Sequence, residues 1–469
     1  MSKSIWSEAR LSPGKVSDQK GGEHRTPFEQ DYDRILFSTA VRRLSDKTQV
    51  FPLDSNDAVR TRLTHSHEVA NLARSIGLRG IATDEDAFQG VDFWRVVLPV
   101  LGSSGLSHDL GNPPFGHQGE AAVCEWFADR EKWIFDRTDN AADASGIPPV
   151  QAEYRNDFLK FDGNPQTLRL LTRLQTSHGK VGLDLSACTI AATMKYTVAA
   201  SNTDKNDPSR KKAGYFHSEK EVVDWVRSET GLAEGQRHPI AWITEAADDT
   251  AYSVLDVEDS MKKGIISPDD LLTILKSDSA LETAPAVVRM AEKFDIVDHL
   301  DRSPIVRRDI KIGYARSFLI EDLVVHATNE YLARKTQIWC YENQTALMDT
   351  SPLCEKLKQV AKQYAFGNSE VLFIEGRGRR AVYRLMDFLW EAITHRSDKE
   401  IHSSRKEAFS RYVFSLISSN YIEASQAENC SDGQASELRY RELRLLTDMV
   451  SGMTDQFALD LFDKVQSLK

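Results

Sequence analysis

Apolar residues recur every three or four positions along most of this chain, and that spacing constrains the fold more than any other feature. It begins with Ile35, Phe37, Val41 and Leu44 and returns in residues 59–76, 91–106, 117–128, 166–177, 240–262, 314–333, 380–395 and 439–468. This period is that of one face of an α-helix. The alternation typical of β-strands is scarce, and its best short example is residues 371–374. We therefore predict an all-α fold.

The helical pattern divides the chain into three parts. Residues 1–30 are rich in glycine, serine, lysine and glutamate, which predicts a mobile N-terminal tail. Residues 31–330 form the predicted helical core, and residues 331–469 form a C-terminal helical region. The glycine- and arginine-rich run 376–380 indicates a solvated turn. Three further stretches break the helical spacing and are predicted to be surface loops: 136–156, 199–218 and 425–437.

Charge and composition exclude several classes of protein. The 469 residues contain 59 Lys and Arg against 70 Asp and Glu, a formal charge of −11, which argues against a protein that coats DNA indiscriminately. There is no run of about 18 apolar residues and no secretory signal, so we expect a cytoplasmic protein that does not span a membrane. Five scattered cysteines indicate reduced thiols and argue against a thiolate zinc site. Glycine-rich phosphate loops and the serine-hydrolase elbow are absent, so phosphate chemistry here needs other residues.

Residues 106–120 hold the densest group of residues suited to chemistry. His108 and Asp109 end an apolar helix, and a Gly-Asn-Pro-Pro turn follows them. His117 and Glu120 come next at a spacing of three, which places both side chains on one face of a helix. An isolated His-Asp pair is commonly a surface or capping pair, so its meaning depends on partners elsewhere in the chain.

Two other predicted helices supply such partners. One carries Arg62 and His65 on a shared face, with Arg60 just before them, and the other carries Asp248, Tyr252 and Asp256 at intervals of four. That interval drifts by only about 40° per step, so the three side chains can face one cleft. Two imidazoles and two carboxylates from three helices suit one divalent cation that keeps positions open for water or a phosphate oxygen. Mixed nitrogen and oxygen ligands suit Mn, Fe, Co or Zn, whereas Mg²⁺ prefers oxygen.

Nearby residues of the same types have plainer interpretations. His67 lies on another helical face than His65, so we expect a structural or surface histidine. Asp249 is an alternative ligand to Asp248, but only Asp248 keeps the four-residue step to Tyr252. Tyr252 taken alone is more often a core residue, and it is the stripe that favours a place in a binding site.

Taken together, these motifs resemble the HD phosphohydrolase superfamily and, more narrowly, its dGTPase or dNTP triphosphohydrolase family. The order that carries the resemblance is His65, then His108 and Asp109, then Asp248. The specific markers are four blocks in sequence: residues 42–51, residues 60–66, the run HDLGNPPFGHQGE at 108–120 and the run EAADDTAY at 245–252. The likeness extends over about residues 31–333, roughly two-thirds of the chain.

The resemblance implies a role for each matching residue. The metal ligands would be His65, His108, Asp109 and Asp248, holding one divalent ion, Mn or Mg first, with Fe, Co, Zn and Ni as alternatives. His117 would stand beside the scissile phosphate with Glu120 as its partner. Substrate contacts would come from Gln49, Arg60, Arg62, Lys195, Tyr252, Asp256 and Arg316. Within that set Arg62 and Lys195 meet phosphate oxygens, and Gln49, Tyr252 and Asp256 hold the deoxyribose.

The implied activity is metal-dependent hydrolysis of dGTP or other dNTPs to deoxynucleoside and inorganic triphosphate. Two alternatives stay open at this point. One is an HD phosphohydrolase that acts on nucleoside monophosphates or cyclic nucleotides. The other is a regulator that binds nucleotides or single-stranded nucleic acid and hydrolyses them only secondarily. The family also implies a homo-oligomer, a tetramer or hexamer, with a dNTP activator or single-stranded DNA as further partners.

Overall fold

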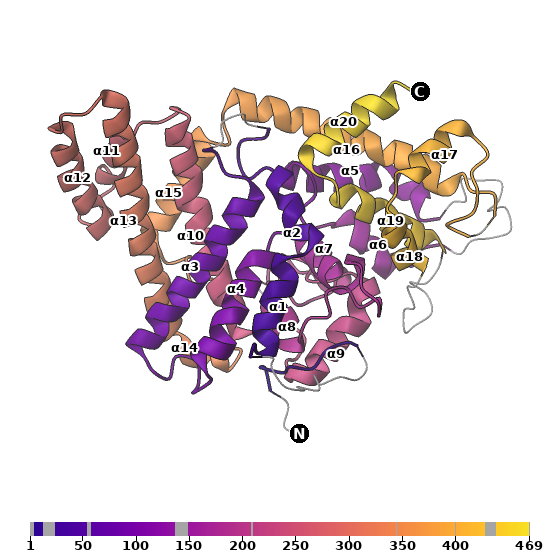
Figure 1. The fold of residues 1–469 in the computed structure, drawn as a ribbon, viewed down its shortest axis with the longest axis horizontal. Helices are drawn as coiled ribbons and strands as arrows, with labels where there is room; N and C mark the ends of the chain where they lie inside the picture. Colours follow the sequence, from indigo (N-terminus) through magenta and orange to yellow (C-terminus); the bar gives the residue numbers. More distant parts are fainter. Residues whose placement is uncertain are drawn as a thin grey trace. The chain divides into compact units, whose positions relative to one another are not determined.

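The computed structural model describes residues 4–12, 24–53, 58–136, 149–207, 210–343, 345–398, 400–426 and 438–468. Within these ranges the regular structure is helical (Figure 1). Extended pairing takes the form of isolated bridges, among them Ala199 with Tyr215 and Arg396 with Arg405. The predicted all-α fold is confirmed. The strand candidate at 371–374 is wrong, because these residues belong to helix α16 (Ser369–Thr394). A run of only four apolar residues does not distinguish a strand from a buried helical turn.

The chain separates into two compact units, each assembled from segments that are distant in sequence. Unit 1 combines Met1–Thr48, Ser107–His238 and Ile374–Lys469, and unit 2 combines Gln49–Leu106 with Pro239–Phe373. This grouping does not follow the linear division predicted at residues 30 and 330. The candidate site residues are accordingly distributed over both units, and each unit is described separately below.

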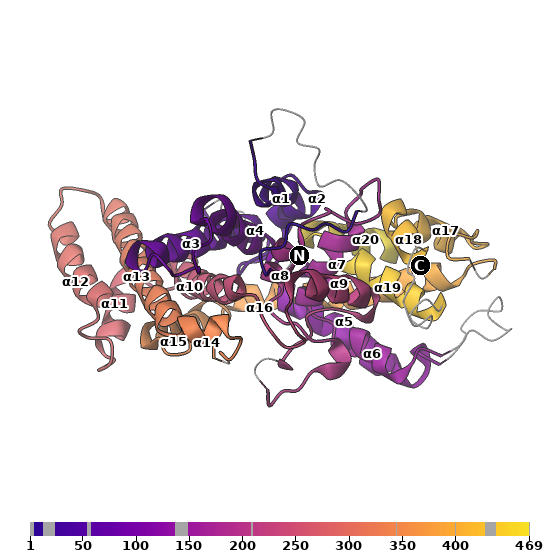
Figure 2. The same cartoon turned by 90° about the horizontal axis from the view of Figure 1, so that it is seen from below.

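Unit 2 is built around one long buried helix. Its helices are α3 (Arg62–Thr83), α4 (Leu98–Ser107), α10 (Pro239–Lys262), α11 (Pro268–Lys276), α12 (Pro285–Asp298), α13 (Pro304–Ala333), α14 (Lys335–Trp339) and α15 (Pro352–Tyr364). Helices α3, α13 and α15 pack against α10, while α11 and α12 lie beside α13 (Figures 1 and 2). Most residues of α10 are buried on all sides, as expected for the central helix of a helical layer.

A repeated local signal starts three of these helices. Ser267, Ser303 and Ser351 each precede a proline, and each serine oxygen accepts a backbone N–H of the first helical turn. The proline fits the first helical position because the amide hydrogen it lacks would have no helical partner there. The Ser303-Pro304 signal therefore starts helix α13 at Pro304, before the first residue of the predicted segment 314–333.

Unit 1 contains the two ends of the chain and a middle segment. Its helices are α1 (Pro27–Leu36), α2 (Thr39–Arg43), α5 (Gly116–Ile134), α6 (Ala152–Leu159), α7 (Gly163–Arg169), α8 (Ala187–Thr193), α9 (Lys220–Thr230), most of α16, α17 (Ala408–Ser415), α18 (Ser419–Gln426), α19 (Leu438–Ser451) and α20 (Asp455–Gln466). The fully buried guanidinium of Arg169 ties α7 to Glu219 and to Asp448 of α19, at 2.7 Å from each carboxylate. Removal of one member of such a buried ion pair typically costs about 3–5 kcal/mol.

Residues before the predicted core boundary at residue 31 also pack in unit 1. Backbone N–H groups of Ala187 and Cys188 donate to the carbonyls of Ala9 and Ser7, at 2.9 and 3.1 Å. Arg10 contacts Asp31 at 2.7 Å. A capping box of Thr26 and Glu29 then starts α1 at Pro27. Part of the segment predicted to be a mobile tail is thus packed on α8, and residues 13–23 lie outside the described residues.

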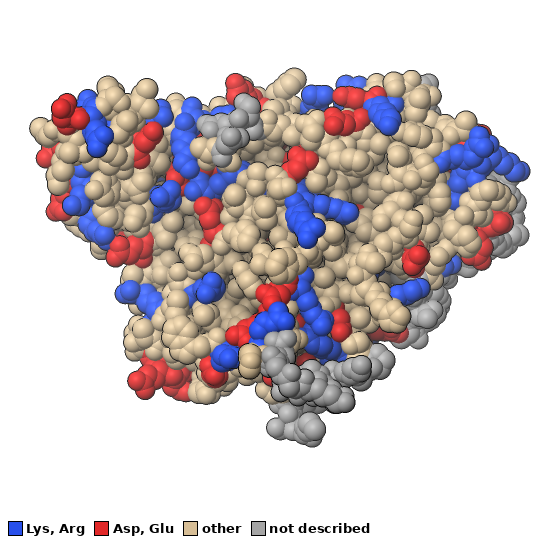
Figure 3. Space-filling view, in the orientation of Figure 1, with Lys and Arg blue, Asp and Glu red and all other residues tan. Residues whose placement is uncertain are grey.

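The remaining segment predictions have mixed outcomes. Most of the predicted loops 136–156 and 425–437 lies outside the described residues, and the end of the first is helical because α6 begins at Ala152. The run 376–380 is not a turn, since it lies inside α16. On the face drawn in Figure 3, basic and acidic side chains form small scattered groups among larger areas of uncharged residues. No helix in the described part of the chain combines the length and apolar character needed to cross a lipid bilayer.

Candidate active site

In unit 2, helices α3 and α10 bring one predicted histidine and one predicted aspartate together. Thr61 caps α3, so the helix begins at Arg62 and His65 points inward from its first turn with only 1% of its surface exposed. Asp248 lies near the middle of α10, and its Oδ1 is 3.2 Å from His65 Nε2. Two donors at this separation can coordinate the same cation.

The choice between neighbouring residues of the same type is visible in unit 2. Asp248 faces His65, whereas the next residue, Asp249, pairs with Lys358 of α15 at 2.9 Å. His67 is exposed on another face of α3, as predicted for a surface histidine. The helical period therefore turns His65 and Asp248 toward each other and turns His67 and Asp249 elsewhere.

The stripe on α10 continues with Tyr252 and Asp256. The Tyr252 ring stacks on Phe366, with centroids 5.8 Å apart and planes inclined by 19°. Asp256 is buried, with 1% exposure, and neither of its carboxylate oxygens has a hydrogen-bond partner among the described residues. Burial and the neighbouring charge of Asp259 raise the pKa of Asp256 well above its ordinary value, against the opposing charges of Arg60 and Arg62. An unpartnered buried carboxyl is unfavourable by itself and is suited to a ligand that supplies a hydrogen bond.

A second buried acceptor of unit 2 belongs to Gln49. Its Oε1 is buried and has no hydrogen-bond partner within the described ranges. The following residues, Val50 and Phe51, pack into an apolar cluster with Ala365 and Val371. This anchoring holds the segment that carries Gln49 and leaves its amide oxygen available to a ligand.

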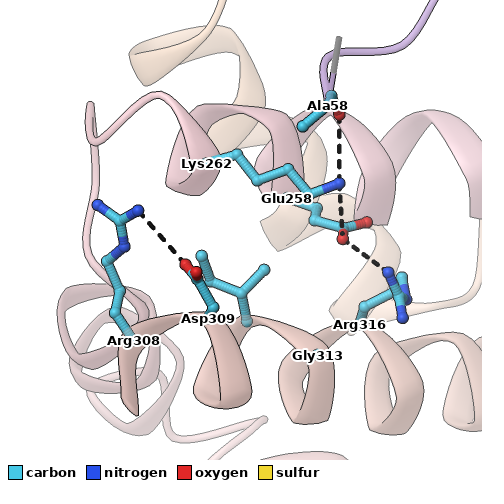
Figure 4. A pocket seen from close by; sticks show the side chains of 8 residues that line it. Ala58, Glu258, Lys262, Arg308, Asp309, Gly313 and Arg316 are labelled. Carbon is cyan, nitrogen blue, oxygen red and sulfur yellow. Dashed lines mark hydrogen bonds and ion pairs between the residues drawn. The ribbon is translucent and has the colours of Figure 1, made fainter. Parts of the chain in front are cut away.

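Arg60 and Arg316 lie in a network of ion pairs around Glu258. Arg60 binds Glu258 at 2.5 Å and Glu68 at 2.9 Å and also contacts Asp259. Arg316 binds Glu258 at 2.8 Å in a pocket that also contains Lys262 and Arg308 (Figure 4). Burial alone would lower the pKa of Arg60, but the adjacent carboxylates outweigh it and raise that pKa. Because Glu258 is two residues beyond Asp256, it points to a different face of α10 from the stripe.

In unit 1, His108 and Asp109 follow α4 in a turn that is seated on α7. The N–H of Gly111 donates to Thr167 Oγ1 at 2.9 Å. A β-carbon at Gly111 would lie 2.2 Å from the carbonyl oxygen of Gly163, so this close approach requires glycine. His108 Nε2 is 3.6 Å from Asp109 Oδ2. This packing fixes the turn that presents both side chains.

Lys195 lines the same small pocket of unit 1 as His108, together with Asn164, Thr167 and Tyr196. The structure therefore brings one predicted phosphate contact to one predicted metal ligand. Lys195 follows α8 in an irregular segment, and no periodicity of the sequence would place it there. A cation beside a histidine-aspartate turn is suited to binding a phosphoryl oxygen.

His117 and Glu120 occupy the first turns of α5. His117 is exposed, while Oε1 of Glu120 accepts the N–H of Gly163 at 2.7 Å, at the start of α7. Glu120 thus connects α5 to the helix that also seats the His108 turn. The N-terminus of α5 carries partial positive charge, which favours an anion beside His117.

Two buried residues, Lys47 and Asp455, hold the segment 112–115 in place, and the sequence motifs predict no functional role for either. The ammonium group of Lys47, 3% exposed, donates to the carbonyls of Asn112 and Ser451, the second at 2.8 Å. Asp455, 1% exposed, accepts the N–H of Phe115 and the N–H of Thr48, each at 2.9 Å. Lys47 falls within a family-like block, but Asp455 is 340 residues from Phe115 and carries no local signal.

Comparison with known proteins identifies relatives that match nearly the whole chain. It is 30% identical to a "Deoxyguanosinetriphosphate triphosphohydrolase-like protein" of Listeria monocytogenes, covering 99% of both chains. It is 31% identical to a "Probable deoxyguanosinetriphosphate triphosphohydrolase" of Pseudomonas aeruginosa, covering 94% of this chain and 93% of the relative. A "Deoxyguanosinetriphosphate triphosphohydrolase" of Salmonella typhimurium is 30% identical over 94% of each chain. No protein-family model matches.

The helical fold and these near full-length relatives define the chain as an enzyme of the hydrolase class. More particularly, it belongs to the deoxyguanosinetriphosphate triphosphohydrolase family. The family resemblance predicted from the motifs is confirmed.

Proposed function

We propose that this protein is a metal-dependent triphosphohydrolase that cleaves dGTP or another dNTP to deoxynucleoside and inorganic triphosphate. The printed names of its relatives support the reaction class. The observation that carries the proposal is the α3–α10 arrangement, in which the His65–Asp248 pair stands two helical turns from the buried carboxyl of Asp256, which has no hydrogen-bond partner in the described part of the chain. One end of this stripe suits a metal ion, and the other suits a sugar hydroxyl.

One divalent cation is proposed, with His65, His108, Asp109 and Asp248 as its ligands. The donor set fits the ion, because two imidazoles and two carboxylates are ordinary ligands of Mn²⁺ and related metals, with Mg²⁺ as the oxygen-preferring alternative. When bound, the ion would supply Lewis acidity at the α-phosphoryl oxygen. The structural support is the 3.2 Å separation of the two donors in unit 2.

The chain's own residues would bind the rest of the nucleotide. Asp256 and Gln49 are proposed to bond the sugar hydroxyl, which would donate its one proton to Gln49 Oε1 and accept from the protonated carboxyl of Asp256. Both groups are buried without a partner among the described residues. Tyr252, held against Phe366, would lie under the deoxyribose and leave little room for a 2′-hydroxyl. Arg62 and Lys195 are proposed at phosphate oxygens. Arg60 and Arg316 are instead proposed to orient Glu258, because their guanidinium groups are engaged there.

Proton transfer is assigned to His117. It stands at the positively polarised start of α5, where its imidazole can orient the attacking water or protonate the leaving 5′ oxygen. Glu120 would keep this end of α5 in place through its hydrogen bond to Gly163. Oligomer formation, a dNTP activator, single-stranded DNA and a cytoplasmic location stay predictions from the family resemblance.

Replacing Asp256 with asparagine tests the sugar site. We expect KM for dGTP to rise about 2- to 10-fold, since a hydrogen bond made by a neutral carboxyl contributes about 0.5–1.5 kcal/mol. The unfolding temperature should not fall, because the carboxyl has no partner within the described part of the protein to lose. Steady-state kinetics with dGTP and GTP, together with calorimetry, measure both effects.

Asp259→Asn is the matched control for this substitution. Asp259 lies three residues further along α10 and binds Arg60, so its change should lower the unfolding temperature and affect KM less. An Asp256→Asn enzyme with the wild-type KM and the wild-type preference for dGTP over GTP would remove Asp256 from the sugar site.

A further inference from the structure

Phe115 stands between the His108–Asp109 turn and His117 in an uncommon backbone conformation. Its φ of 61° and ψ of 21° lie in the left-handed region, which residues other than glycine rarely adopt. It forms the N-terminal boundary of α5, so its geometry determines the direction in which the helix and His117 leave the turn. A strained residue in such a place requires surroundings that hold it.

The backbone on both sides of Phe115 is fixed. Asp455 accepts the Phe115 N–H at 2.9 Å, and Lys47 binds the carbonyl of Asn112. Gly119 lies so close to the turn that a β-carbon there would be 2.1 Å from the carbonyl oxygen of Pro114. This segment therefore has little freedom to absorb a displacement.

The Phe115 ring, 5% exposed, packs on α16 at a glycine. A β-carbon at Gly378 would lie 2.4, 2.5 and 2.6 Å from the Cγ, Cδ1 and Cδ2 atoms of that ring. Cγ is at the base of the ring, so rotation about the Cβ–Cγ bond leaves it in place and does not remove the overlap. Gly376, two positions earlier in the same helix, has nothing within 4 Å of its β-carbon position.

We propose that the contact between Phe115 and Gly378 positions His117, so that α16 determines the geometry of the histidine assigned to proton transfer. This inference rests on the role proposed above for His117. A methyl group at Gly378 would have to push the ring away by about 1 Å to reach ordinary contact. Because the segment is held by Asp455 and Gly119, the shift must pass along the backbone to His117, two residues further on. Gly378 and Phe115 are thus positioning residues, and neither contacts the substrate in this account.

The experiment compares Gly378→Ala with Gly376→Ala in the full-length protein. Both changes add one methyl group to α16 and remove one glycine from a helix, so they share every effect of helix propensity. Gly378→Ala should lower kcat about 10- to 100-fold, the loss typical of misplacing a reacting group by about 1 Å, with KM within about twofold of wild type. Gly376→Ala should keep the wild-type kcat.

A double-mutant cycle separates an effect transmitted through the Phe115 ring from a general disturbance of α16. In a Phe115→Ala background the ring is gone, so adding Gly378→Ala should cause no further loss of kcat. This background also provides the test if Gly378→Ala alone does not fold, since the double variant then regains the stability of Phe115→Ala. If Gly378→Ala lowers kcat in this background as much as it does with the ring present, the loss does not act through the Phe115 ring and the proposal is wrong.

A readout that does not need activity keeps this inference separate from the proposed function. In ¹⁵N-histidine NMR spectra, the His117 signals, assigned with His117→Gln, should move in Gly378→Ala and stay in place in Gly376→Ala. Identical His117 signals in the two variants would overturn the positioning role whatever the wild-type activity. Absence of triphosphate release by the wild type would instead refute the proposed function and leave the spectral comparison decisive for the contact.

Discussion

Replacing His65 with alanine is expected to abolish metal binding and nucleotide hydrolysis together. His65 is buried and faces Asp248 at 3.2 Å, so the change removes a nitrogen donor from the proposed metal site. Loss of several kcal/mol of charge stabilisation corresponds to about a thousandfold or greater loss of kcat/KM. Titration calorimetry with Mn²⁺ and a triphosphate-release assay measure the two effects on one preparation.

His67→Ala is the control for this experiment. It deletes the same side chain two residues away, on an exposed face of α3, and should leave both quantities unchanged. Circular dichroism and the unfolding temperature would show whether His65→Ala is folded, and Asp248→Asn with Asp249→Asn forms a second matched pair. Unaltered Mn²⁺ affinity in both His65→Ala and Asp248→Asn would place the metal elsewhere.

For His117→Ala we expect a protein that still binds Mn²⁺ and dGTP but turns over about 100- to 10,000-fold more slowly. The reason is that His117 contributes a proton transfer and no metal ligation in this account. Because His117 is exposed at the start of α5, the unfolding temperature should change little. Equilibrium binding of dGTP and single-turnover kinetics separate nucleotide affinity from the chemical step.

His178→Ala removes another exposed histidine of unit 1 and should keep full activity. A loss of nucleotide affinity in His117→Ala that accounts for all of the lost kcat/KM would make His117 a binding residue. Unchanged turnover would exclude it from proton transfer altogether.

Features with a local period could be predicted from the sequence. The interval of four placed Asp248, Tyr252 and Asp256 on one face of α10, and the same argument separated Asp248 from Asp249 and His65 from His67. The all-α class followed for the same reason, since a 3.6-residue period extends over many turns. Where the run was too short to show a period, as at 371–374, the prediction was wrong.

Contacts between residues distant in sequence were not predictable. Arg60 was expected at the substrate, yet its guanidinium binds Glu258 and Asp259, which lie 198 and 199 residues away. The glycines of the run 376–380 suggested a turn, whereas Gly378 serves the close approach of Phe115 inside a helix. Sequence spacing reports which side chains share a face, but packing decides which of the many charged groups meet.

Identification of the reaction products tests the central claim most directly. The full-length protein is incubated with Mn²⁺ or Mg²⁺ and, separately, with each dNTP, a deoxynucleoside monophosphate and a cyclic nucleotide, and the products are resolved by ion-exchange chromatography. We predict that at least one dNTP yields deoxynucleoside and inorganic triphosphate in equal amounts. Release of orthophosphate or pyrophosphate from the dNTPs, or hydrolysis confined to the monophosphate or the cyclic nucleotide, would contradict the account.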